Sequence, residues 1–245
     1  MAAETGVTDQ DRVSRVMGTF AANRATGQPR SVCSVSVDLL GVSATCVTLM
    51  NGRNSTPVCA SDDRATRLDD LQYSLGEGPS PDAYSRNLPI YEPDLGGPSP
   101  SRWQHFGPSA LGLGTLGVFA FPLQVGASCV GVLTVYQNTA GSLSPTQEAD
   151  GLVVADTIAR SMLRVRPEGD FEALAMGGFS DGGAHRAEFH QASGMIAVQL
   201  GIDVSEAAVR VRAHAYVEGR AVAEVATEIV GGRLRLDDDA AGREV

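Results

Sequence analysis

The chain has 245 residues, 43% of them apolar and 20% charged, which is typical of a globular protein of one or two domains. All 19 basic residues are arginine, which excludes Schiff-base and PLP chemistry and a P-loop that uses its usual lysine. The net charge of -10 argues against non-specific coating of DNA, although a local basic stripe remains compatible with it.

The four cysteines show no Cys-x-x-Cys spacing, so zinc-ribbon and thioredoxin-like sites are not predicted. No apolar run approaches the roughly 18 residues of a membrane span. We therefore expect a cytoplasmic protein with reduced thiols, no membrane contact, no metal and no cofactor. Cys46 and Cys129 fall in strand patterns, where cysteine is usually a small buried hydrophobe.

An amphipathic helix is predicted to begin after Thr8, because Asp11 follows three residues later as in a capping box. Its apolar residues recur every three or four positions, which places them on one helical face. This face consists of Val13, Val16, Met17, Phe20 and Ala21.

The pattern then changes to the period of two that is typical of strands. Val42–Met50 alternates in this way and is followed by Asn51-Gly52, a dipeptide that favours a type I′ turn. Thr56–Ala60 is predicted to be the returning strand, and Pro57 favours a position at the edge of the sheet.

A long segment rich in glycine, proline and serine comes next and is predicted to be irregular, with one short strand at Leu88–Tyr91. Two stronger strand patterns, Gly117–Val125 and Cys129–Tyr136, are separated by a three-residue connection and predict a hairpin. Hairpins imply an antiparallel sheet.

A second amphipathic helix is predicted to begin after Ser144, since Pro145 suits the first helical position and Gln147 can reach back to cap it. We expect this helix and the N-terminal one to pack on one face of the sheet. The irregular segment would then cover the other face, with room for a pocket beneath it. The expected fold class is therefore α+β.

Several short motifs in residues 8–166 together resemble a GAF domain. They are Glu77-Gly78-Pro79-x-x-Asp82-Ala83, Leu88-Pro89-Ile90, Arg102-Trp103, Phe119-Ala120-Phe121-Pro122-Leu123, Gly131-Val132-Leu133 and Leu143-Ser144. The resemblance implies a GAF-like sensor or dimerisation domain with an antiparallel sheet, and a small ligand whose identity the sequence leaves open. The lysine-containing signature of the cyclic-nucleotide-binding branch is absent, so we do not predict cyclic nucleotide binding.

A glycine-rich stretch, residues 167–184, carries acids and no arginine and is predicted to be a linker. Residues 185–236 then hold as many acids as arginines and are followed by an acidic tail, residues 237–245.

Three helices are predicted within residues 185–236. The first spans about Glu188–Leu200 and ends at Gly201; the second begins at Asp203 and ends at Gly219. The third spans about 221–234. We expect the apolar stripe of the second helix to consist of Val204, Ala208, Val211 and Ala215. Short connections and marginal individual helices predict a small all-α three-helix bundle.

The second of these helices places Arg212 and Tyr216 one turn apart on a flank of its apolar stripe, and Arg220 follows just beyond its end. Guanidinium groups can bind phosphates and an aromatic ring can stack on an unpaired base, which suits RNA. The alternative interpretation is a solvated helix surface with one half-buried tyrosine.

A nearly continuous pattern over residues 185–236 resembles the ANTAR domain, a three-helix RNA-binding module of bacterial antitermination regulators. It comprises Gln191-Ala192-Ser193-Gly194-Met195-Ile196, Gln199-Leu200-Gly201, Asp203, Glu206-Ala207, Arg210–Tyr216, Gly219-Arg220 and Glu224–Val230. The resemblance implies binding to paired stem-loops in leader transcripts. The RNA-facing candidates that it implies are Gln191, Ser193, Gly194, Met195, Arg212, Ala213, Tyr216 and Arg220.

Taken together, these patterns predict a homodimeric regulator of transcription antitermination in which a GAF-like unit controls an RNA-binding ANTAR unit, without catalysis. One alternative is an enzyme that reduces methionine sulfoxide through cysteines, which would require Cys33, Cys46, Cys59 and Cys129 to gather near a pocket. Another alternative is a DNA-binding transcription factor, because a compact pair of helices can act as a helix-turn-helix.

Overall fold

The computed structural model describes residues 8–26, 29–52, 54–97, 102–163, 182–218, 220 and 222–236. The chain divides into two compact units, Met1–Ser180 and Asp181–Val245, which we describe separately.

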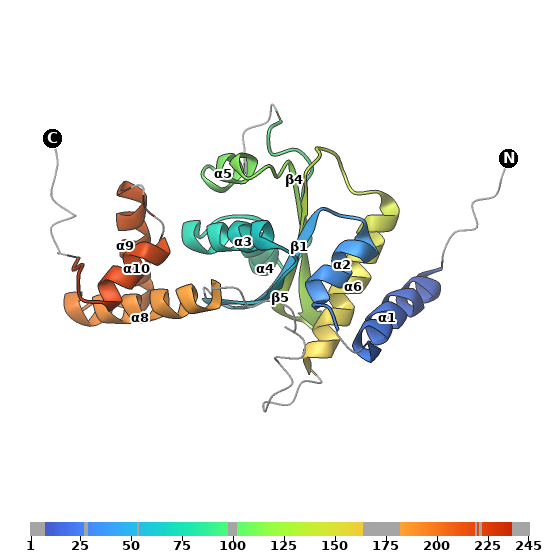
Figure 1. Ribbon diagram of the computed structural model, residues 1–245, viewed down its shortest axis with the longest axis horizontal. Helices are drawn as coiled ribbons and strands as arrows, with labels where there is room; N and C mark the ends of the chain where they lie inside the picture. The colour runs from blue at the N-terminus through green and yellow to red at the C-terminus, as the bar shows by residue number, and fades with distance from the viewer. Residues whose placement is uncertain are drawn as a thin grey trace. The chain divides into compact units, whose positions relative to one another are not determined.

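The N-terminal unit is built on a five-stranded sheet with the spatial order β2-β1-β5-β4-β3, and all neighbouring strands are antiparallel (Figure 1). Its strands are β1 (Ala44–Asn51), β2 (Asn54–Ala60), β3 (Ile90–Glu92), β4 (Gly117–Val125) and β5 (Ser128–Gln137). Both predicted hairpins are confirmed, and β2 lies at the predicted sheet edge. The antiparallel sheet with flanking helices confirms the predicted α+β class for this unit.

The first hairpin turn differs from the prediction by one residue. Asn51 pairs with Asn54 across the two strands, so that position 52 and the undescribed position 53 connect them. Gly52 has φ of 61°, a left-handed conformation that suits glycine, whereas Asn51 does not have positive φ. Strand β1 ends at Asn51, one residue later than predicted.

Helices cover both faces of the sheet (Figure 1). One side carries α1 (Asp9–Ala25), α2 (Val32–Leu40) and α6 (Pro145–Leu163), and the other carries α3 (Asp63–Leu75), α4 (Pro79–Arg86) and α5 (Phe106–Gly112). A buried apolar cluster lies on each side. The first cluster includes Val16, Phe121 and Ile158, and the second includes Leu68, Phe106 and Tyr136.

Two expectations about these layers were wrong. The predicted irregular segment contains α3, α4 and α5, because its polar and glycine residues begin and end helices: Asp62 caps α3, Gly76 ends it with φ of 68°, and Pro79 starts α4. Helix α1 does not lie directly on the sheet; it packs mainly against α2 and α6, and α2 was not predicted.

The predicted caps of α1 and α6 are confirmed. The Thr8 hydroxyl accepts from the backbone N–H of Asp11, whose carboxylate accepts in return. Likewise, Ser144 Oγ accepts from the backbone N–H of Gln147 at 3.2 Å, and the Gln147 side chain accepts from Ser144 N at 3.0 Å. Each reciprocal pair satisfies donors that an α-helix leaves open at its start.

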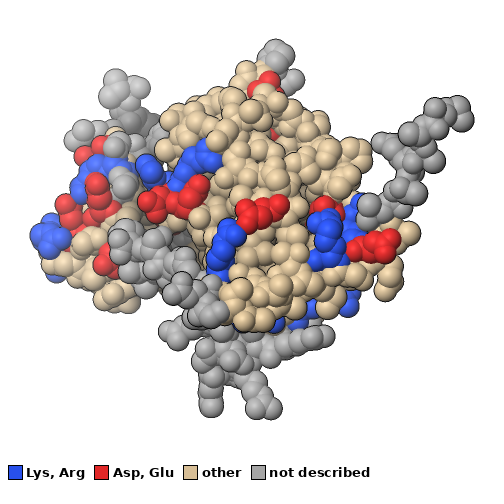
Figure 2. Space-filling view, turned by 45° about the vertical axis from the view of Figure 1, so that its right-hand side comes forward, with Lys and Arg blue, Asp and Glu red and all other residues tan. Residues whose placement is uncertain are grey.

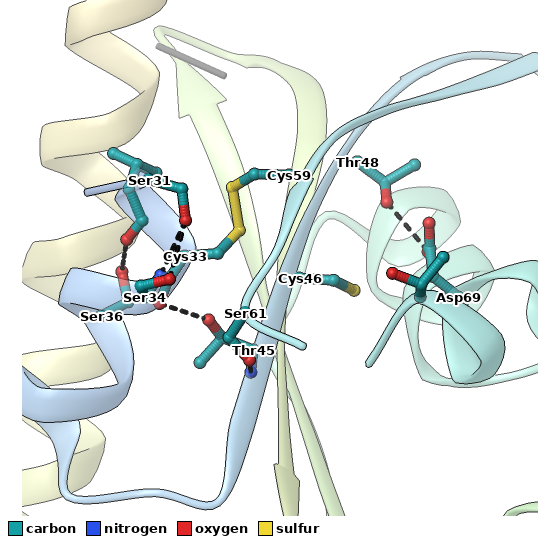
Figure 3. The surroundings of a disulfide bond; sticks show 12 residues. Ser31, Cys33, Ser34, Ser36, Thr45, Cys46, Thr48, Cys59, Ser61 and Asp69 are labelled. Carbon is teal, nitrogen blue, oxygen red and sulfur yellow. Dashed lines mark hydrogen bonds between the residues drawn. A yellow bond between two sulfur atoms is a disulfide. The ribbon is translucent and has the colours of Figure 1, made fainter. Parts of the chain in front are cut away.

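The expectation of four reduced cysteines was also wrong. Cys33 of α2 and Cys59 of β2 form a disulfide, with both residues buried in the cluster that includes Val16 (Figure 3). Sequence spacing gave no sign of this pair, because Cys33 and Cys59 come together only when α2 packs over the edge strand. Cys46 and Cys129 are free thiols, as expected, and Cys46 is buried.

The C-terminal unit consists of α8 (Gly182–Leu200), α9 (Val204–Val217) and α10 (Val222–Val230). Its core contains Phe189, Ala192, Ile196, Ala197, Ala207, Val211, Ala215, Val225, Ala226 and Ile229. The three helices therefore bury apolar faces against one another. Gly201, with φ of 66°, follows the end of α8 as predicted.

Some details of this unit differ from expectation. Helix α8 begins at Gly182, inside the stretch predicted to be linker, and α10 ends at Val230 rather than near Leu234. Val204 is exposed instead of buried, because it is the first residue of α9 and lies beyond the helix contacts. The rest of the predicted linker, Gly219 and the tail 237–245 lie outside the described residues.

Within the described residues, no single helix combines the length and apolar character of a membrane span. Only a pair of segments bent by 107°, Glu188–Leu200 with Val204–Ala215, meets that test jointly.

Candidate nucleic-acid interface

The RNA-facing candidates on α8 divide into exposed and buried positions. Gln191 is exposed and Met195 is 40% exposed, whereas Ser193 is only 1% exposed. The Ser193 hydroxyl donates to the backbone oxygen of Phe189 at 2.8 Å, one turn earlier in the helix. Ser193 therefore cannot offer its hydroxyl to RNA from this position. Its neighbour Gly194 is partly exposed.

Arg212 and Ala213 are the candidates on α9 whose side chains the structure describes. Arg212 is partly exposed, and its guanidinium carbon lies 4.9 Å from the centroid of the Phe189 ring, which brings α9 against α8 through a cation–π contact. Ala213 is exposed, and Tyr216 is a helical residue whose side chain lies outside the described part. Of the predicted flank on α9, the structure therefore describes the side chain of Arg212, which is partly exposed.

The structure does not bring all the candidates into one patch. Phe189 belongs to the buried stripe of α8, whereas Gln191 and Met195 lie on a different side of that helix. Because Arg212 lies over Phe189, it is separated from Gln191 and Met195 by the body of α8. The described candidates form one group on α8 and another on α9 and its exit.

Arg220, just beyond α9, is engaged by acids of α10. Its guanidinium contacts the Glu228 carboxylate at 2.9 Å and 3.1 Å, and its Nε lies 3.8 Å from Glu224 Oε2. The hydrogen bonds from Arg220 are the first reason why the pKa of Glu228 lies below its ordinary value, and the same pair raises the pKa of Arg220. Arg220 is therefore not an isolated cation.

Sequence reasoning missed Glu228 and Glu224 as partners of Arg220. A spacing of four residues, as between Arg220 and Glu224, indicates an ion pair when both residues lie in one helix. The break between α9 and α10 removes that indication from the sequence. The Glu228 contact spans eight residues and arises only from the way α10 begins. Figure 2 shows the same mixing of charge on the face it presents, where acidic and basic side chains lie beside one another.

The start of α9 is fixed by Asp203. Its carboxylate accepts the backbone N–H of Ser205 at 2.7 Å, and this hydrogen bond is the main reason why the pKa of Asp203 is lowered. Asp203 was predicted to start the helix, and this is confirmed. The side chain of Glu206, three residues on, pairs with Arg210 at 3.0 Å.

In the N-terminal unit, buried polar side chains fill the region between the sheet and α3 and α4, where the sequence predicted a pocket. Gln72 donates to the Tyr136 hydroxyl at 3.0 Å and accepts from the Ser80 backbone N–H at 2.7 Å. Ser80 and Thr134 share a hydrogen bond of 2.7 Å between their hydroxyls. These groups satisfy one another, so a ligand at this place would have to replace hydrogen bonds that already exist.

The Glu77-Gly78-Pro79 motif has a clear architectural role. Glu77 accepts the backbone N–H groups of His105 and Phe106 at 2.6 Å and 2.8 Å, which fixes the start of α5. Gly78 has φ of 138°, and a Cβ there would lie 2.7 Å from the Gln72 side chain. The motif therefore holds the helical cover on the sheet.

The cysteines are not gathered in one place. Figure 3 shows the Cys33–Cys59 disulfide on one side of the sheet and Cys46 pointing to the other, where its sulfur lies 3.4 Å from the Tyr136 hydroxyl. Cys129, near the β4–β5 turn, contacts the backbone oxygen of Gly131. The clustering that a cysteine-based reductase would need is not present. Among the described residues, no three His, Cys, Asp or Glu side chains are grouped to hold a metal ion.

The described arrangement is thus a helix-covered antiparallel sheet followed by a three-helix unit. No family model and no curated protein matches the sequence. Solved structures with similarity include the GAF domain of a phosphoenolpyruvate-protein phosphotransferase from Coxiella burnetii, at 14% identity and a TM-score of 0.47, covering 64% of this chain and 95% of that one. The corresponding GAF domain from Acinetobacter has 12% identity and a TM-score of 0.46, covering 67% and 96%.

Proposed function

We propose that this chain is an RNA-binding regulator of transcription antitermination. In this proposal the C-terminal unit is an ANTAR-like module that binds paired stem-loops in nascent leader RNA. The N-terminal unit is a GAF-like domain that senses a small ligand or holds a homodimer, and the protein acts in the cytoplasm without catalysis.

The observation that carries the proposal is the position of the α9 flank. Arg212 and Ala213 keep partly or fully exposed positions on α9, and Arg220 follows at its exit, while Ala207, Val211 and Ala215 are buried. Arginines on a helix and just beyond its end, next to the position of an aromatic residue, suit looped RNA better than a regular duplex.

The two alternatives have less support. The separation of Cys46 from the Cys33–Cys59 disulfide removes the clustering on which the reductase alternative depended. For the DNA-binding alternative, the near balance of acids and arginines in residues 185–236 gives little of the phosphate attraction on which duplex binding depends.

The proposal is tested by measuring binding of the full chain to a labelled RNA of two adjacent short hairpins, with unlabelled duplex DNA of equal length as competitor. We expect saturable RNA binding that duplex DNA does not displace at moderate salt. Displacement by equimolar duplex DNA would favour the DNA-binding alternative, and absence of RNA binding would contradict the proposal.

A further inference from the structure

The exit of α9 holds an ion pair whose geometry is also that of a phosphate site. Two nitrogens of Arg220 contact the two carboxylate oxygens of Glu228, at 2.9 Å and 3.1 Å. A forked guanidinium binds a carboxylate and a phosphate through the same pair of parallel hydrogen bonds. Glu228 therefore occupies the donors that an RNA phosphate would use.

A second arginine, Arg233, is also close to Glu228. The backbone N–H of Arg233 donates to the backbone oxygen of Glu228 at 2.8 Å, so the two residues are neighbours at the end of α10. After the hydrogen bonds from Arg220, the positive charges of Arg220 and Arg233 also lower the pKa of Glu228. Glu228 thus lies where the charges of two arginines favour an anion, and Arg233 did not belong to the predicted site.

The pair is accessible enough to exchange partners. The side chains of Arg220 and Glu228 are 31% and 34% exposed, so solvent and a ligand can reach both. An exposed ion pair of this kind contributes little net free energy, because water screens it and two side chains are immobilised. Replacing the carboxylate by a phosphodiester therefore costs little.

We propose that Glu228 is an internal competitor for RNA: it holds the Arg220 guanidinium in the free protein and releases it to a phosphodiester. This inference rests on the proposed RNA-binding function and adds a subsite and its regulation. Glu224 acts in the same direction but more weakly, because it makes a single 3.8 Å contact and is 65% exposed.

The test uses the full chain and the labelled two-hairpin RNA at fixed moderate salt. Glu228→Gln keeps the shape of the side chain and removes its charge, so we expect binding about three- to tenfold tighter than wild type. Glu206→Gln is the matched control, because Glu206 also pairs with an arginine, Arg210, at 3.0 Å within the same unit. It changes the net charge equally, and we expect it to alter affinity much less. Glu224→Gln should give a smaller gain than Glu228→Gln.

The double variant Arg220→Ala with Glu228→Gln should lose the gain, since the freed guanidinium is then absent. The inference is overturned if wild type binds the RNA and Glu228→Gln binds no more tightly than Glu206→Gln, with unchanged helical circular dichroism. If folded wild type and Glu228→Gln both fail to bind, the proposed function fails along with the inference. If Glu228→Gln binds the RNA and wild type does not, Glu228 blocks the site in the free protein, which supports the inference.

Discussion

At the scale of single residues, close packing between α6 and the sheet depends on a missing side chain. A Cβ at Gly151 would lie 2.6–3.0 Å from three atoms of the Phe121 ring, nearer than real Cβ contacts. Phe121 lies on β4 and its side chain is fully buried against α6, so it has little room to move. The small residue therefore sets how closely α6 approaches β4.

Gly151→Ala should lower the free energy of unfolding by about 1–3 kcal/mol, because the added methyl overpacks a filled core. Urea denaturation followed by circular dichroism measures this change. Gly18→Ala is the control: Gly18 also lies inside a helix, α1, but nothing lies within 4 Å of its Cβ position. There the gain in helix propensity should stabilise the protein by roughly 0.5–1 kcal/mol. Equal effects of the two substitutions would contradict the packing argument.

A second residue-scale prediction concerns the candidate interface. Arg212→Ala together with Tyr216→Ala should weaken binding to the two-hairpin RNA at least about tenfold, since a phosphate contact and a base-stacking group are lost. Val198→Ala serves as the control, because Val198 is 86% exposed on α8 and outside the candidate set. Unchanged affinity of the double variant at moderate salt would show that the assigned flank does not bind RNA.

At the scale of elements, α1 is held on α6 by a buried carboxylate. Asp150 accepts from Arg12 Nε at 2.8 Å and lies 2.6 Å from Arg15 Nη2, and its side chain is only 6% exposed. Arg12 is itself 9% exposed. Removing one member of a buried pair leaves the other charge without compensation, which costs more than the intact pair contributes.

Asp150→Asn should therefore destabilise the N-terminal unit by about 3 kcal/mol and increase amide hydrogen exchange in α1. Asp156→Asn on the same helix is the matched control, because the Asp156–Arg160 pair is exposed by 50% and 72%. Its loss should cost less than about 1 kcal/mol. Similar losses in the free energy of unfolding for the two variants would mean that burial does not make the Asp150 contacts more important to stability than an exposed ion pair.

The disulfide fastens the edge strand β2 to α2. Replacing Cys33 and Cys59 with serine, or reducing the bond, should lower the stability of the N-terminal unit by about 2–4 kcal/mol, since it closes a loop of 26 residues in the unfolded chain. Thiol titration of the denatured chain should find two free thiols before reduction and four after it. If all four cysteines are alkylated when the protein is isolated in the presence of an alkylating agent and before any reduction, the disulfide is contradicted.

These elements also show what the sequence can and cannot predict. Period-two alternation predicts β1, β4 and β5, and local caps predict the starts of α1, α6 and α9, because both signals lie within a few neighbouring residues. Helices α2 to α5 were missed, since their ends are rich in residues that also mark loops. The disulfide, the Asp150 contacts and the Arg220–Glu228 pair depend on distant segments and have no local signal.

The same limit applies to the candidate site. Helical periodicity places Arg212 and Ala213 at the surface, but it cannot reveal that Arg212 lies over Phe189 or that Ser193 is directed inward. Ser193 was included because of a family resemblance, and its hydroxyl bonds to its own helix instead. Burial of a small polar residue is decided by tertiary packing and not by its neighbours in sequence.

At the scale of the whole molecule, a net charge of -10 opposes association with RNA. Binding must then come from few phosphate contacts together with base stacking and shape. With two or three arginines engaged, the slope of log affinity against log salt should be shallow, about -1.4 to -2.1. Titrations of the labelled RNA at several salt concentrations measure it. A slope several times steeper would indicate a broad electrostatic interface that this chain does not have on its described α9 flank.

The central claim is that the three-helix unit binds structured leader RNA. Crosslinking the full protein to RNA in living cells, followed by purification and sequencing of the bound fragments, tests it most directly. We predict enrichment of leader segments that contain two adjacent hairpins, and loss of this enrichment in the Arg212→Ala, Tyr216→Ala double variant. Fragments spread evenly over transcripts, or no RNA above the level of the double variant, would contradict it.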